Sequence, residues 1–124
     1  MQKQKILIVD DDEDIQALIK LACSSFDLEV IQIKTMQKAI EAFEKESPVI
    51  TLMDITLPGG SGLAALRKIR SMSIRKREHP KIIMVSARTS QQDQDKAIAY
   101  GADEYLTKPF NLEQIKQVIE RHLE

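Results

Sequence analysis

Four apolar runs in this sequence each lead into a side chain that can do chemistry. The runs are Lys5–Val9, Val49–Met53, Lys81–Val85 and Glu104–Thr107. If the runs are strands of an open α/β sheet, the side chains that follow them meet at its carboxyl edge, where such sheets place their sites. Three carboxylates, a hydroxyl and an ammonium are suited to holding a metal ion and a phosphoryl group together. The residues concerned are Asp10, Asp11, Asp54, Ser86 and Lys108.

Three carboxylates at one sheet edge need a counter-charge. Asp10, Asp11 and Asp54 would repel one another, and such repulsion raises carboxylate pKa values. A divalent cation relieves the repulsion. A site made of a few protein oxygens suits Mg²⁺, which keeps several waters and shares phosphate oxygens, so we expect Mg²⁺ or Mn²⁺ as cofactor. The neighbouring Asp12 is instead predicted to cap the helix that follows it.

Strand and helix patterns alternate five times along the chain. Leu28–Ile33 adds a fifth, partly alternating strand to the four runs. Apolar residues at helical spacing then predict five helices. The marker residues are Ile15, Leu18, Ile19 and Ala22 (ending near Ser25); Met36, Ala39, Ile40 and Phe43; Leu63, Leu66 and Ile69; Ala97 and Ile98; and Leu112, Ile115, Ile119 and Leu123.

Capping residues support these helices. Thr35 is a plausible N-cap, Gly101 is placed to follow the fourth helix, and Asn111 with Gln114 resembles a capping box. The alternation predicts an α/β fold with a parallel sheet covered by helices on both faces and joined by right-handed crossovers.

Composition restricts the class of protein. The chain has 124 residues, 43% of them hydrophobic, and a net charge of −1, which suits one domain and creates no global field toward nucleic acid or an anionic membrane. We find no apolar stretch of membrane-spanning length and no signal peptide before the first strand. The single cysteine, Cys23, excludes a disulfide framework and is predicted to be a core residue. The chain is typical of a cytoplasmic protein.

The motifs as a set resemble the receiver domain of response regulators, the phosphoacceptor module of two-component signalling. They are Val9-Asp10-Asp11, Met53-Asp54 with Pro58 and Gly62 following, Val85-Ser86-Ala87, and Lys108-Pro109-Phe110. The resemblance covers essentially the whole chain, residues 1–124. It implies a flavodoxin-like, doubly wound five-stranded parallel sheet of order 2-1-3-4-5 with five helices.

The resemblance also implies roles for the residues of the sheet edge. Asp54 would accept the phosphoryl group. Asp11 and Asp54 would bind the metal directly, Thr56 would add its backbone carbonyl, and Asp10 would help through water. Lys108 would neutralise phosphoryl charge, aimed into the site by a cis peptide bond to the proline that follows it.

Further residues would carry the response. Ser86 resembles the family's switch hydroxyl and Tyr105 the aromatic that turns inward when that hydroxyl moves. Together they would alter the surface formed by the fourth helix, the fifth strand and the fifth helix. Thr56 and Arg88 lie two positions beyond Asp54 and Ser86, where the family's residues tune the phosphate lifetime.

Partners follow from the same resemblance. A sensor histidine kinase or a histidine phosphotransfer protein would donate the phosphoryl group, and an effector domain or protein would receive the signal. A homodimer through the surface just named is possible, while direct nucleic-acid binding and membrane binding are not expected. The basic segment Arg75-Lys76-Arg77 is interpreted as a solvated loop, with partner docking as the alternative. The chain could be a stand-alone receiver or part of a longer regulator, although Met1 close to the first strand favours a natural N-terminus.

Other classes fit the residues less well. A phosphatase with an aspartate nucleophile would need a threonine after Asp-x-Asp and a cap domain. A calcium loop would need glycine where Ile15 stands and glutamate where Leu21 stands. A dinucleotide-binding domain would need G-x-G-x-x-G after the first strand. A degenerate receiver that signals without phosphate is disfavoured because every acceptor residue is present.

Overall fold

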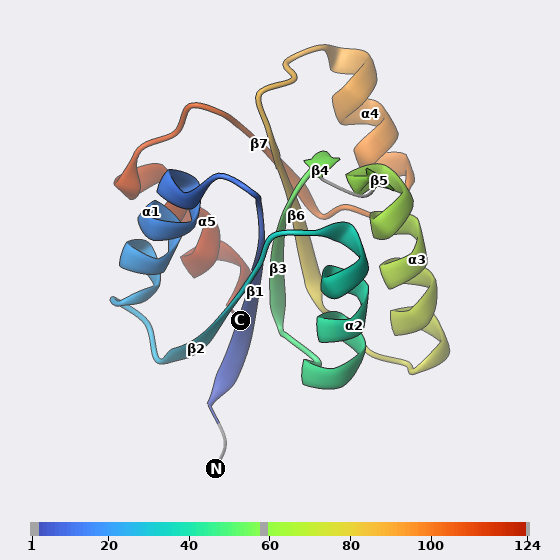
Figure 1. The fold of residues 1–124 in the computed structure, drawn as a ribbon, viewed down its shortest axis with the longest axis horizontal. Coiled ribbons are helices and arrows are strands. Elements are labelled where there is room, and N and C mark those ends of the chain that lie inside the picture. The colour runs from blue at the N-terminus through green and yellow to red at the C-terminus, as the bar shows by residue number, and fades with distance from the viewer. Residues whose placement is uncertain (1–2, 58–59, 124) are drawn as a thin grey trace.

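The computed structural model describes residues 3–57 and 60–123 (Figure 1). Five parallel strands form the main sheet in the order β2-β1-β3-β6-β7. They are β1 (Gln4–Val9), β2 (Leu28–Ile33), β3 (Ile50–Asp54), β6 (Lys81–Ser86) and β7 (Glu104–Thr107). Taken in chain order, this is the predicted order 2-1-3-4-5, so the doubly wound fold is confirmed.

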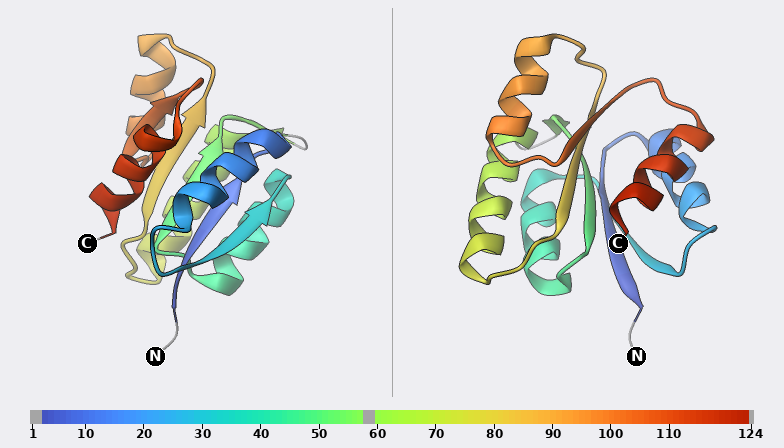
Figure 2. Two further views of the ribbon diagram at one scale, coloured as in Figure 1. Left: turned by 90° about the vertical axis from the view of Figure 1, so that its left-hand side faces the viewer. Right: turned by 180° about the vertical axis from the view of Figure 1, so that it is seen from behind.

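Five helices cover the two faces of the sheet. They are α1 (Glu13–Cys23), α2 (Met36–Glu46), α3 (Gly62–Arg75), α4 (Gln91–Ala99) and α5 (Leu112–His122). Helices α1 and α5 lie together on one face, and α2, α3 and α4 lie on the other, as the three views show (Figures 1 and 2).

Each face of the sheet has its own hydrophobic core, because side chains alternate along a strand. In β1, Leu7 and Val9 pack into the α2–α3–α4 core, whereas Ile6 and Ile8 pack into the α1–α5 core. All four are fully buried, as expected for a central parallel strand covered on both sides. This double burial makes the centre of the sheet a rigid support for the residues at its carboxyl edge.

The predicted caps are confirmed. Thr35 and Asn111 accept hydrogen bonds from backbone N–H groups of α2 and α5, and Asn111 forms the full capping box with Gln114. Gly101 follows α4 with φ +114°, a conformation that other residues rarely adopt. Cys23 is buried in the α1–α5 core, as predicted, and this burial raises the pKa of its thiol to about 11.

Three details differ from the prediction. Helix α1 ends at Cys23, short of Ser25, because the chain turns there and Phe26 N donates to Cys23 O. Helix α3 continues to Arg75, so the first residue of the basic segment is helical and only the next two lie in the loop. A small antiparallel hairpin of β4 (Thr56–Leu57) and β5 (Gly60–Ser61) was not predicted, since two residues per strand leave no periodic pattern.

Within the part of the chain that the structure describes, no helix has both the length and the apolar character needed to cross a membrane.

Candidate functional site

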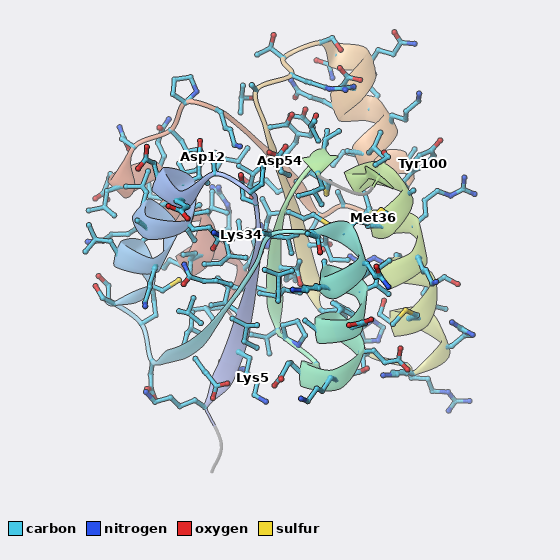
Figure 3. All side chains as sticks on the ribbon, in the orientation of Figure 1. Lys5, Asp12, Lys34, Met36, Asp54 and Tyr100 are labelled. Atoms are coloured by element: carbon cyan, nitrogen blue, oxygen red, sulfur yellow. The ribbon has the colours of Figure 1, made fainter. Side chains whose placement is uncertain are left out.

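Strand register brings the predicted site residues together at the carboxyl edge of the sheet. Val9 of β1 pairs with Met53 of β3, so Asp10 and Asp54 are the next residue along on two adjacent strands. Asp10, Asp11 and Asp54 each place a carboxylate oxygen within 4.8 Å of the others. Asp10 and Asp54 are buried and Asp11 is exposed, so the cluster opens to solvent on one side. Figure 3 shows Asp54 at this edge of the sheet.

Lys108, which follows β7, completes the cluster. Ser86 of β6 pairs with Thr107 of β7, and Lys108 follows directly, with its backbone N donating to Ser86 O at 2.7 Å. Its ammonium nitrogen lies 3.0 Å from Asp54 Oδ2 and 2.8 Å from Asp10 Oδ2. The Lys108–Pro109 peptide bond is cis. At the two distances given, the ammonium of this lysine bridges the two buried carboxylates.

The two oxygens of Asp54 have different partners. Oδ1 accepts a hydrogen bond from the backbone N–H of Thr56 at 3.0 Å, and Oδ2 accepts one from Lys108. The carboxylate is held in one orientation by these two bonds. Because the residue is only 7% exposed, a reacting group must approach through the solvent side of the cluster, where Asp11 lies.

Burial and pairing act against each other on the ionisation of this cluster. Burial raises the pKa of Asp10, with the charge on Asp54 adding to the effect, and the contact with Lys108 offsets only part of it. Burial alone would lower the pKa of Lys108, but its close contacts with the carboxylates of Asp10 and Asp54 together raise it. The two aspartates thus favour the charged form of the lysine.

One oxygen of the cluster lacks a hydrogen-bond donor. Asp10 Oδ1 accepts from Asp12 N at 2.9 Å, but Oδ2 is buried without a well-aligned donor anywhere in residues 3–57 and 60–123. Lys108 is at ion-pair distance from Oδ2, but its approach is poorly aligned for a hydrogen bond. An incompletely satisfied carboxylate in an all-oxygen cluster with an open side fits the donor set that Mg²⁺ requires.

Gly62 explains part of the motif that follows Asp54. A Cβ atom at this position would collide with the backbone carbonyl oxygen of Asp54 and crowd the backbone of Ile55. Gly62 N also donates to Ile55 O at 2.6 Å, which closes the loop between β3 and α3. The glycine is needed for close approach of two backbone segments behind the Asp54 side chain. Pro58, the other motif residue of this loop, lies outside the described residues.

The predicted switch residues meet at the loop that follows β6. Ser86 is buried, and its Oγ accepts a hydrogen bond from Arg88 N at 3.1 Å. The half-buried Tyr105 donates its hydroxyl hydrogen to Arg88 O at 2.8 Å. Arg88 is therefore held through its backbone by both residues, while its guanidinium lies 3.8 Å from a carboxylate oxygen of Asp93. Thr56, the other tuning candidate, is exposed beside Asp54.

Asp12 and Gln16 support the Asp10 loop from α1. Asp12 caps the helix as predicted, accepting from Asp14 N and Ile15 N. Sequence reasoning missed Gln16, whose side-chain amide donates to the carbonyl oxygens of Ile8, Asp10 and Ile33. The available signal was its position three residues before Ile19, which puts a polar residue on the buried stripe of the helix.

Comparison with known proteins places this geometry in a family. The family model described as the response regulator receiver domain matches residues 6–120. The regulatory protein VanR of Enterococcus faecium is 38% identical over 115 residues, which span 92% of this chain and 48% of VanR. The transcriptional regulatory protein YxdJ of Bacillus subtilis is 35% identical, over 94% of this chain and 51% of YxdJ. The chain spans about half the length of the curated relatives it matches.

Solved structures agree. A CheY-like receiver domain from Methanospirillum hungatei superposes with a TM-score of 0.86 at 29% identity, covering 97% of this chain and 93% of that one. The receiver domain of Ssk1 from Saccharomyces cerevisiae, solved with the histidine phosphotransfer protein Ypd1, has a TM-score of 0.87 at 27% identity, covering 97% and 88%. Receiver domains are phosphorylation switches of two-component signalling that bind Mg²⁺ at an acidic pocket. This chain belongs to the response regulator receiver domain family.

Proposed function

We propose that this protein accepts a phosphoryl group on Asp54 and relays that event as a change in partner binding. The observation that carries the proposal is the ammonium of Lys108 bridging Asp54 and Asp10 beside a three-carboxylate cluster. One cation already faces the acceptor oxygen, and a second cation has an oxygen-lined place next to it. Phosphoryl transfer needs positioning and charge neutralisation above all, and this edge of the sheet offers both.

The transfer forms one bond and breaks another. A carboxylate oxygen of Asp54 attacks the phosphorus of a phosphohistidine on the donor. A P–O bond forms, the P–N bond breaks, and the leaving imidazole takes up a proton from solvent, so that an aspartyl phosphate remains. Mg²⁺, held directly by Asp11 and Asp54, through water by Asp10 and by the carbonyl of Thr56, would neutralise phosphoryl charge. Mn²⁺ suits the same oxygens.

Lys108 and Ser86 would hold the product. The Lys108 ammonium is 3.0 Å from Asp54 Oδ2, so a small movement brings it to a phosphoryl oxygen. The Ser86 hydroxyl accepts from Arg88 N, which leaves its own hydrogen free to donate to that group. Hydrolysis by water would return Asp54 and inorganic phosphate, with Thr56 and Arg88 setting the rate. The activity is therefore that of a slow self-catalysed switch.

The response would pass through the loop between β6 and α4. If Ser86 turns to the phosphoryl group, Arg88 N loses its acceptor, and the carbonyl that holds the Tyr105 hydroxyl shifts with it. Tyr105 is then free to turn inward. The surface of α4, β7 and α5 would change its shape and its affinity for an effector domain, an effector protein or a second copy of the chain.

The proposed function also implies a class of phosphoryl donor and the extent of the domain. We infer a sensor histidine kinase or a histidine phosphotransfer protein as donor, in line with the Ssk1 receiver domain solved together with Ypd1. We infer one receiver domain over residues 1–124 and a cytoplasmic location, with no direct contact to nucleic acid or membrane by this domain.

Intact mass spectrometry after incubation with acetyl phosphate and Mg²⁺ tests the proposal. We expect one added phosphoryl group, lost when Mg²⁺ is omitted and absent from Asp54→Asn. Lys108→Ala should still bind Mg²⁺, but phosphorylation of Asp54 in this variant should no longer reorient the Tyr105 ring. NMR signals of the ring report its rotation. A variant Asp54→Asn that gains the same mass would refute the assignment of the acceptor. No mass gain together with no response to beryllofluoride would favour a receiver that signals without phosphate.

A further inference from the structure

Helix α3 has a stripe of side chains to which the proposed function assigns no role. Arg67, Arg70, Ser71, Ile74 and Arg75 recur at spacings of three and four, so they share one face of the helix. With the end of α4 they line a groove of about 490 Å³. Figure 1 shows the end of α4 beside α3, and Figure 3 labels Tyr100 at this junction.

The groove contains an apolar surface open to water. Ile74 is 68% exposed, the largest exposure among the large hydrophobic side chains of the described residues. The half-buried ring of Tyr100 and the small side chain of Ala99 line the same groove. Scattered apolar residues on a surface are ordinary, but an exposed isoleucine in a concave site that an aromatic ring also lines is a feature of binding sites.

Cations flank this apolar surface. Helix α3 contains four lysines and arginines and no carboxylate; they are Arg67, Lys68, Arg70 and Arg75. Arg70 is committed to the fold, because it donates to Pro80 O and Gly101 O and pairs with Asp103 at 2.9 Å. This network makes one wall of the groove rigid.

The other two arginines remain available. Arg67 lies over the ring of Tyr100, 4.8 Å from its centroid, which orients its guanidinium without neutralising it. Neither Arg67 nor Arg75 has an ion-pair partner within residues 3–57 and 60–123. They are eight positions apart, so their backbones stand about 12 Å apart along the helix, with Ile74 within this span.

We propose that this α3–α4 groove docks an acidic segment of a partner protein that carries one apolar anchor. The anchor would pack on Ile74 and Tyr100, and carboxylates on either side of it would pair with Arg67 and Arg75. A nucleic acid fits less well, since it would bury an exposed isoleucine against phosphates, and the net charge of −1 gives no general attraction to a polyanion. The groove contains no residue of the phosphoacceptor cluster, so docking should not require phosphorylation.

An NMR titration tests this proposal with ¹⁵N-labelled protein. The probe is a short synthetic peptide of glutamates around one central leucine, compared with versions in which glutamine replaces glutamate or alanine replaces leucine. We expect shifts at the amides of α3 and of residues 99–100, and weaker binding of both comparison peptides. Asp54→Asn should bind the peptide as the parent protein does, which separates this proposal from the function of Asp54.

Matched variants make the test sharper. Arg75→Glu should weaken binding about three- to thirtyfold, because a surface ion pair is replaced by repulsion of similar size. Ile74→Ser should weaken it about three- to tenfold through the lost apolar contact. The control is Lys20→Glu, which reverses the same charge in the last turn of α1, on the other face of the sheet, and should leave binding unchanged.

Three results would overturn the proposal. The first is the absence of shifts at millimolar peptide. The second is binding of a single-stranded oligonucleotide at the same amides with an affinity that Ile74→Ser does not alter, since this would identify a nucleic acid as the occupant. The third is self-association of the protein that Arg75→Glu abolishes, since this would identify a second copy of the chain.

Discussion

Replacing Gln16 with leucine should destabilise the protein out of proportion to the change in size. The side chain is 4% exposed, and its amide donates to Asp10 O at 3.0 Å, to Ile33 O at 2.9 Å and to Ile8 O at 3.2 Å. Leucine fills a similar volume but donates nothing. The three carbonyls would then depend on whatever other donors reach them.

The cost can be estimated from the two shorter of these hydrogen bonds, those to Asp10 O and Ile33 O. Asp10 O would lose its hydrogen bond from the Gln16 amide, and leaving a buried carbonyl unpaired costs roughly 1–3 kcal/mol. Ile33 O keeps the hydrogen bond from Asp10 N at 3.1 Å, so its loss is smaller, on the order of 0.5–1 kcal/mol. Gln16 Oε1 is itself buried without a donor from residues 3–57 and 60–123, so its removal returns part of this cost. The net loss should be about 2 kcal/mol, or roughly 6–8 °C in Tm for a domain of this size.

Urea unfolding followed by circular dichroism measures this loss. Gln117→Leu, at an exposed position on α5, is the matched control and should change stability by less than about 0.5 kcal/mol. A loss below about 0.5 kcal/mol for Gln16→Leu would refute the reasoning. Mg²⁺ affinity should also fall severalfold, because Gln16 holds the backbone of Asp10. Lower stability with unchanged Mg²⁺ affinity would show that the residue supports the fold without positioning the site.

Three further predictions rest on other parts of the molecule. Gly62→Ala should cost about 2–3 kcal/mol in urea unfolding, because its Cβ would collide with the carbonyl oxygen of Asp54; a neutral effect would mean that the loop relaxes freely. Cys23, buried and with a pKa raised to about 11, should resist Ellman's reagent at pH 8 until urea is added; rapid reaction in the folded protein would contradict its burial. Glu46 has a pKa lowered from 4.5, chiefly by its hydrogen bond to Lys5, so its ionised form stabilises the fold. The stability difference between the parent and Glu46→Gln should therefore be present at pH 7 and shrink as the pH falls from 4.5 through the lowered pKa; a difference that persists below that range would argue against the ion pair.

Much of the fold could be predicted because its signals are local. Continuous apolar runs marked buried parallel strands, and helical spacing with caps such as Thr35 and Asn111 marked the helices. The acidic cluster was predictable for the same reason, since Asp10 and Asp11 come at the end of one apolar run and Asp54 at the end of another. Once strands are parallel and adjacent, the residues after them must meet at one edge.

What escaped prediction depends on contacts between distant segments. The β4–β5 hairpin has too few residues for a periodic pattern. Gln16 looks like any polar helix residue until strands β1 and β2 supply the carbonyls it bridges. The α3–α4 groove is lined by residues of α3 and by Ala99 and Tyr100, which are distant in the sequence, so the sequence alone showed only a basic segment.

The separation of the two cores by the sheet has a consequence for how this protein can change over generations. Leu7 and Ile8 are neighbours in β1, yet they belong to cores that share no side chain. Substitutions more than about 7–10 Å apart without shared partners are nearly additive in their effect on stability. A lineage can therefore repack the helices on one face to suit a new partner while the opposite face drifts under its own constraints. The constraints that both faces share are the backbone of the strands and the aspartates at the strand ends.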